Sequence, residues 1–183
     1  MAGEGHGAEI GCAVGGGQAD PPVHDAAMSK SLKRVERAAA EAGLDITILE
    51  MAEGTRTAAD AARAAGCEID QIIKSIIFRG EDDGQAILFL TAGGNRVDDA
   101  KAGAAAGEVL GKADAGLIRS QTGFAIGGVA PIGHLNPIRA FMDPRLFDFD
   151  VIWAAAGTPR HIFSVNPRDI ERLTGAQVTD FIA

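Results

Sequence analysis

The feature that most constrains the fold is a pair of apolar runs in the middle of the chain. Isoleucine and phenylalanine occupy five of the seven positions 72–78, and a second apolar run covers 86–90. The stretch Glu81-Asp82-Asp83-Gly84 between them has the composition of a turn. Two short apolar runs joined by such a turn are typical of paired strands within a core. The sequence therefore predicts a buried β-hairpin near the centre of the domain.

Helix and strand signals surround this hairpin. Apolar residues at helical spacing follow Ser29, and Thr57 with Asp60 resembles a capping box before an alanine-rich helix over 58–65. Further helices are expected over about 98–106, from about 114 to 122 and over 167–173, and further strands over 45–50, 138–142, 151–156 and 161–165. Because these elements lack regular βαβ spacing, we expect a single mixed domain of the α+β class.

Length and composition set the domain organisation. A chain of 183 residues with 46% hydrophobic content can form one core and is short for two. Residues 1–27 are rich in glycine and lack a periodic apolar pattern, so we expect a disordered tail there. The folded domain is expected over residues 28–183.

The charge and the cysteine content exclude several classes of protein. A net charge of -8 leaves no broad basic surface, so any contact with nucleic acid must be local. Cys12 and Cys67 have no metal-ligand or disulfide pattern around them, and no apolar run is long enough for a membrane span. We therefore expect a cytoplasmic protein without metal, cofactor or membrane partner.

Lys74 is the most informative single residue. It interrupts the apolar run of the hairpin, where burying an ammonium group costs free energy unless the group has a partner or a task. One interpretation is a substrate-contacting lysine with a lowered pKa. The alternative is a lysine on the solvent face of an edge strand, where it would protect the edge from aggregation.

A glycine-rich loop is the second candidate for chemistry. Residues 127–134 read Gly-Gly-Val-Ala-Pro-Ile-Gly-His, a composition that can present bare backbone N–H groups to an oxyanion or carbonyl. The segment matches neither the dinucleotide fingerprint nor the P-loop, and an ordinary connecting loop is the alternative. His134 could transfer a proton or shape a pocket, although a lone histidine is more often a structural hydrogen-bonder.

Asn95 and Arg96 follow the second strand of the hairpin, where a guanidinium could hold a phosphate or a carboxylate. The alternative is a solvated turn that leads into a helix with Asp98 as its cap. No nucleophile-elbow or zinc-protease motif is present, so catalysis would depend on positioning rather than on a covalent nucleophile.

Taken together, these segments resemble the YbaK/prolyl-tRNA synthetase editing-domain superfamily, in its trans-editing branch. The resemblance extends over about 29–182. It is carried by the hairpin lysine and, some fifty residues later, by Gly127, Pro131, Gly133 and His134 in the family's order, with supporting similarity at residues 57–62, 95–98 and 122–124.

The resemblance implies a YbaK-like fold, a mixed α/β domain around a largely antiparallel, barrel-like sheet. It also implies deacylation of tRNA carrying a small wrong amino acid such as alanine, cysteine, serine or threonine, with the aminoacyl-tRNA acceptor end and prolyl-tRNA synthetase as partners. Lys74 and Gly128 would be catalytic. The substrate-binding residues would be Thr57, Ser75, Asn95, Arg96, Gly127, Val129, Pro131, Gly133 and His134.

Two other functions fit parts of the same pattern. The domain could bind tRNA ends or nucleotides without hydrolysis, as a recruiting module. Alternatively, a desolvated Lys74 could form a Schiff base with a carbonyl substrate.

Overall fold

The computed structural model describes residues 29–53 and 55–183, so the expected tail over 1–27 lies outside the described residues. Five α-helices in this part are α1 (Lys30–Glu41), α2 (Ala58–Ala65), α3 (Asp99–Ala106), α4 (Ala115–Thr122) and α5 (Pro167–Thr174). The strands are β1 (Ile48–Glu50), β2 (Ile73–Gly80), β3 (Ala86–Ala92), β4 (Leu110–Lys112), β5 (Arg139–Met142), β6 (Ile152–Thr158), β7 (His161–Val165) and β8 (Gln177–Val178). Two short 3-10 helices are η1 (Ile69–Gln71) and η2 (Pro144–Asp148).

The predicted hairpin forms the middle of a five-stranded sheet of order β4-β2-β3-β5-β8. β2 and β3 pair antiparallel from Ile73 opposite Ala92 to Arg79 opposite Ala86, while β3–β5 and β5–β8 pair in parallel. Every residue of β3 is buried. Leu88 and Leu90 enter one apolar cluster, whereas Ile87 and Phe89 enter another on the opposite face. Burial on both faces explains why this strand reads as a continuous apolar run.

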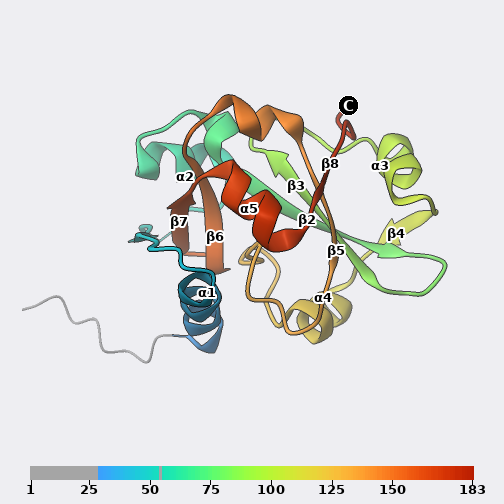
Figure 1. Cartoon of the computed structure of the whole chain (residues 1–183), viewed down its shortest axis with the longest axis horizontal. Helices are drawn as coiled ribbons and strands as arrows, with labels where there is room; N and C mark the ends of the chain where they lie inside the picture. Colours follow the sequence, from blue (N-terminus) through green and yellow to red (C-terminus); the bar gives the residue numbers. More distant parts are fainter. Residues whose placement is uncertain (1–28, 54) are drawn as a thin grey trace, which may run out of the picture.

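A second sheet of three antiparallel strands, β1-β7-β6, lies beside the first, and α1 packs beneath β6 (Figure 1). The two sheets are linked by an isolated bridge between Ile72 and Trp153. The larger cluster fills the space between them, with α1 contributing Leu32 and Val35. The start of β2 thus lies at the junction of the two sheets.

The fold class and most predicted elements are confirmed. The capping box at Thr57 and Asp60 is present, and Gly66 ends α2 in the left-handed conformation, as its lack of a Cβ allows. The sheet is mixed and open rather than closed into a barrel. The strand expected over 45–50 shrinks to three residues, because only Ile48–Glu50 pair with β7. In residues 29–53 and 55–183, no helix is long and apolar enough to cross a membrane.

Candidate functional site

A cavity of about 600 Å³ opens at the junction of the two sheets. The start of β2, the N-terminal end of α2, the glycine-rich loop and the β6–β7 turn all contribute to its wall. Its volume is within the usual range for small-molecule sites. Five of the residues singled out by sequence line it together: Thr57, Lys74, Ser75, Gly127 and Val129.

Lys74 lies in this wall, half-buried, between two apolar clusters. Strand alternation puts its side chain on the same face of β2 as Ile72 and Ile76. Ile72 belongs to a small cluster with Met51, and Ile76 packs against the cluster around Phe89. Burial lowers the pKa of Lys74, and the charge of Arg96 lowers it further. The charges of Asp143 and Asp70 act in the opposite direction, and the net lowering of the pKa means that burying this ammonium group costs stability.

The ammonium group of Lys74 donates a hydrogen bond to the backbone carbonyl of Asn95. The Asn95 side chain, in turn, donates to Asp143 with an N–O distance of 2.8 Å. Asn95 therefore contacts the lysine through its main chain and does not itself line the cavity. Arg96 is exposed, and its carbonyl accepts the N–H of Ala183 at 3.0 Å.

Asp143 is a residue that sequence reasoning missed. Its side chain is 2% exposed and accepts hydrogen bonds from the Thr91 hydroxyl, the Ala92 N–H, the Asn95 amide and the Arg145 N–H. These bonds tie the turn after β3 to the segment after β5. Asp143 thereby fixes the carbonyl that receives Lys74. An Asp-Pro pair directly after a strand was the available signal, but nothing in the sequence indicates its partners.

The glycine-rich loop contributes Gly127 and Val129 to the cavity wall. Within the described residues, the N–H groups of Gly127 and Val129 make no hydrogen bond, whereas the N–H of Gly128 donates to the Ala125 carbonyl at 3.1 Å. Gly127 has a φ of 86°, a left-handed conformation suited to glycine. A Cβ at Gly128 would come within 2.8 Å of the Thr158 backbone. Gly128 is therefore needed for close packing against β6, and its neighbours carry the available donors.

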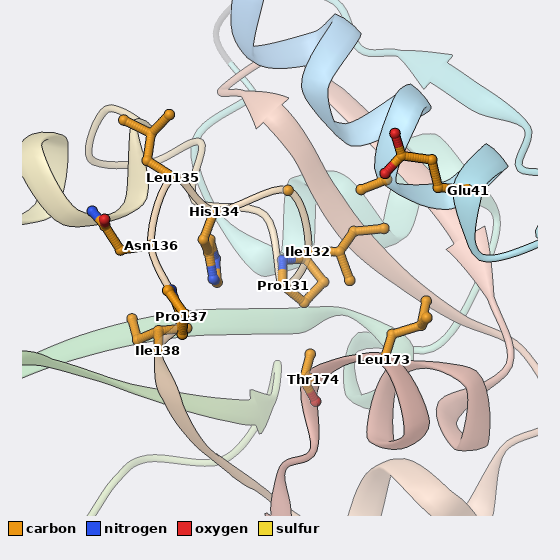
Figure 2. Close-up of a pocket in the computed structure, with 12 residues that line it drawn as sticks. Glu41, Pro131, Ile132, His134, Leu135, Asn136, Pro137, Ile138, Leu173 and Thr174 are labelled. Carbon is orange, nitrogen blue, oxygen red and sulfur yellow. The ribbon is translucent and has the colours of Figure 1, made fainter.

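His134, Pro131 and Gly133 lie away from this cavity. They line a second pocket of about 500 Å³ between α1, the loop and α5 (Figure 2). The His134 Nε2 lies 2.6 Å from the Ala130 carbonyl, and the ring packs edge-on against Phe124. The Gly133 carbonyl accepts a hydrogen bond from Arg34 at 3.0 Å. The structure thus separates the two halves of the GxxxPxGH segment, which the sequence had placed in one site.

Burial lowers the pKa of His134 below its ordinary value of 6.5, and the nearby charge of Arg34 acts in the same direction. Protonation consequently favours the unfolded chain. The stabilisation is complete above pH 6.5 and is lost as the pH falls through the lower folded-state pKa. As the pH is lowered from 6.5 through the folded-state pKa of His134, we expect the melting temperature of the wild type to fall by a few degrees. The melting temperature of His134→Gln should fall less over the same range. Equal acid sensitivity of both proteins in thermal denaturation would contradict this assignment.

The β6–β7 turn contributes two further residues that sequence reasoning missed. His161 and Thr158 line the cavity, and the Thr158 hydroxyl lies 2.6 Å from the His161 Nδ1. Within the described residues, the Nε2 atom of His161 has no hydrogen-bond partner. The sequence shows His161 only as the start of a strand, so its place in the same cavity wall as Lys74 depends on the packing of the two sheets.

The most buried residues of the cavity wall are apolar. Its buried lining residues are Met51, Ala61, Ile72, Ile73, Val129 and Ile162, whereas its polar lining residues are half-buried or exposed. In the described part of the chain, no group of three or more His, Cys, Asp or Glu side chains is placed to hold a metal ion. The cavity wall thus combines the Lys74 ammonium group, the exposed guanidinium of Arg56, the half-buried imidazole of His161 and six buried apolar side chains.

Comparison with known proteins gives consistent matches to this chain. Residues 52–173 match the model of the aminoacyl-tRNA editing domain family. The solved structure of a candidate trans-editing enzyme for prolyl-tRNA synthetase is 44% identical and superposes with a TM-score of 0.80, covering 85% of this chain and 99% of its own. The uncharacterized protein YwhH of Bacillus subtilis is 28% identical over 148 residues, 81% of this chain and 94% of YwhH.

Proposed function

Because the chain belongs to the aminoacyl-tRNA editing domain family, we propose that it is a trans-editing hydrolase acting on mischarged tRNA. In this proposal the substrate is proline tRNA carrying a small wrong amino acid, released by prolyl-tRNA synthetase in the cytoplasm. The observation that supports the proposal is that Lys74 lines one cavity together with Gly127 and Val129, whose backbone N–H groups make no hydrogen bond within the described residues.

The chemistry asked of this cavity is modest, since an aminoacyl ester is already activated. A water oxygen attacks the ester carbonyl carbon, the bond to the ribose oxygen breaks, and that oxygen leaves with a proton. The N–H groups of Gly127 and Val129 would stabilise the charge that develops on the carbonyl oxygen. Lys74 would hold the terminal nucleotide or the ester in one pose, and its neighbour His161 would contact the substrate through Nε2.

The apolar floor supports a small apolar acyl group. A seryl or threonyl hydroxyl reaching Met51, Ile72 and Ile162 would lose hydrogen bonds to water without replacement. The site should therefore take alanyl or cysteinyl groups in preference to seryl or threonyl ones.

A deacylation panel tests the proposal. Proline tRNA charged with alanine, cysteine, serine, threonine or proline should be hydrolysed fastest with alanine or cysteine, by roughly tenfold or more over serine and threonine. Hydrolysis should persist in EDTA, because the proposed chemistry uses no metal. If none of the five substrates is hydrolysed faster than its buffer rate, the proposed function is wrong.

The same experiment separates the alternatives. A non-catalytic module that binds tRNA ends would retain the charged tRNA without hydrolysing it. A Schiff-base enzyme would instead be trapped at Lys74 by borohydride in the presence of a carbonyl substrate. Neither outcome is expected under the proposal, which uses Lys74 to hold the substrate and Gly127 and Val129 of the same cavity to stabilise the carbonyl oxygen.

A further inference from the structure

The charge distribution on α1 is unusual for a protein of net charge -8. Its first eight residues contain four cations, and its first turn contains no acidic residue. Helix N-termini favour acidic side chains, because the macrodipole is positive there. Lys30 with Lys33, and Lys33 with Arg37, are also like-charge neighbours at helical spacing. Both arrangements work against helix stability, and Glu36 and Glu41, the two acidic residues of α1, offset part of that cost. The helix therefore carries four cations against two carboxylates.

Three of these cations are accessible to solvent. Lys30, Lys33 and Arg37 are exposed, and none of them forms an ion pair within the described residues. They lie opposite the buried face of α1, which carries Leu32 and Val35. Outside α1, six of the ten arginines in the described residues form ion pairs, as Arg139 does with Glu108 and Arg145 does with Asp70.

The basic face adjoins the loop that forms the cavity. Arg34, on the flank of α1, donates hydrogen bonds to the carbonyls of Gly123, at the end of α4, and of Gly133, near the end of the glycine-rich loop. The Ser31 carbonyl lies against Gly157, next to the cavity residue Thr158. Arg119, an exposed cation on α4, is close enough to lower the pKa of Arg34, and both helices lie at the same end of the molecule (Figure 1).

We propose that the outer face of α1, formed by Lys30, Lys33 and Arg37 and continued by Arg119, binds the phosphate backbone of the tRNA acceptor stem whose aminoacylated end enters the cavity. This inference rests on the proposed function. Lys30 and Arg37 are about 10 Å apart along the helix axis. One strand of a duplex carries about one phosphate per 3.4 Å, so several phosphates fall within that reach. A local cation cluster also resolves how an acidic protein binds a polyanion.

A matched pair of double variants tests the proposal. Lys33→Gln with Arg37→Gln removes two charges from the basic face, whereas Lys112→Gln with Arg168→Gln removes two exposed, ion-pair-free charges elsewhere. Arg34 is left intact, because it holds the loop. Binding of uncharged proline tRNA is measured over a salt series. Deacylation is measured on full-length alanyl-tRNA and on the alanyl ester of adenosine.

The α1 variant should bind tRNA roughly tenfold more weakly and reduce the slope of log Kd against log salt by about 1 per lost phosphate contact. It should raise KM for alanyl-tRNA, keep kcat, and hydrolyse alanyl-adenosine as the wild type does. The Lys112/Arg168 variant should resemble the wild type throughout. Unchanged tRNA binding and salt slope in the α1 variant, or equal losses in both variants, would overturn the proposal.

The binding measurement keeps this inference separate from the proposed function. If the wild type hydrolyses neither ester, the proposed function fails, and the salt series on uncharged tRNA still decides whether α1 binds nucleic acid. If the wild type hydrolyses alanyl-tRNA but the α1 variant binds tRNA as the wild type does, the editing proposal stands. The acceptor stem then contacts another face of the protein.

Discussion

Lys74→Ala should lower deacylation of the best mischarged tRNA by at least about a hundredfold, the effect of losing one positioning or electrostatic contact in a water-poor site. The fold should be almost unaffected, because burial lowers the pKa of this lysine and its charge contributes little to stability. Lys74→Arg should not restore activity. A planar guanidinium cannot occupy the place of a compact ammonium bonded to the Asn95 carbonyl.

Single-turnover deacylation, circular dichroism and melting temperature provide the measurements. Lys112→Ala is the matched control, because Lys112 is an exposed lysine on β4 of the same sheet. A folded Lys74→Ala protein with near wild-type activity would leave Lys74 as a structural lysine and remove it from the site.

Asp143→Ala should destabilise the domain by about 3 kcal/mol, because it leaves several buried donors without an acceptor. Thr91 and Ala92 are both fully buried, so water cannot replace the lost carboxylate there. For a domain of this size the loss corresponds to a fall in melting temperature of roughly 6–12 °C. Deacylation should fall as well, since the Asn95 carbonyl would no longer be held in place for Lys74.

Asp143→Asn should have a smaller effect, because one amide oxygen can still accept hydrogen bonds from the strand. Asp148→Ala is the control, since Asp148 is an exposed carboxylate whose pair with Arg145 contributes little. Thermal denaturation that ranks all three variants equally would refute the role given to Asp143.

The elements of this protein were predictable because their signals are local. The capping box at Thr57, the helix-ending Gly66 and the two runs of the hairpin depend on neighbours within a few residues. The strand over Gln177–Val178 was missed, because two residues give no periodic pattern and pair only through β5. The open sheet was also missed, since strand alternation does not say how strands associate.

The candidate site divides in the same way. Lys74 could be singled out because a charge within an apolar run is costly wherever the run folds, and the glycine-rich loop stood out by composition. Asp143 and His161 could not be singled out in this way. An Asp before a proline and a His at the start of a strand are both common in protein sequences. Each gains its place from partners distant in the chain, as Asp143 does from Thr91.

The sequence by itself therefore determined the helices and strands, the class of fold and the lysine to examine. Only the tertiary structure decided which backbone donors are free, and it moved His134 from the lysine's cavity to the pocket behind the loop. The physical reason is that a loop has two sides. Composition can predict that residues 127–134 form an ordered turn. The side that each residue faces is set by the elements packed against the loop. In this protein β6 packs against Gly128, and α1 packs against Gly133.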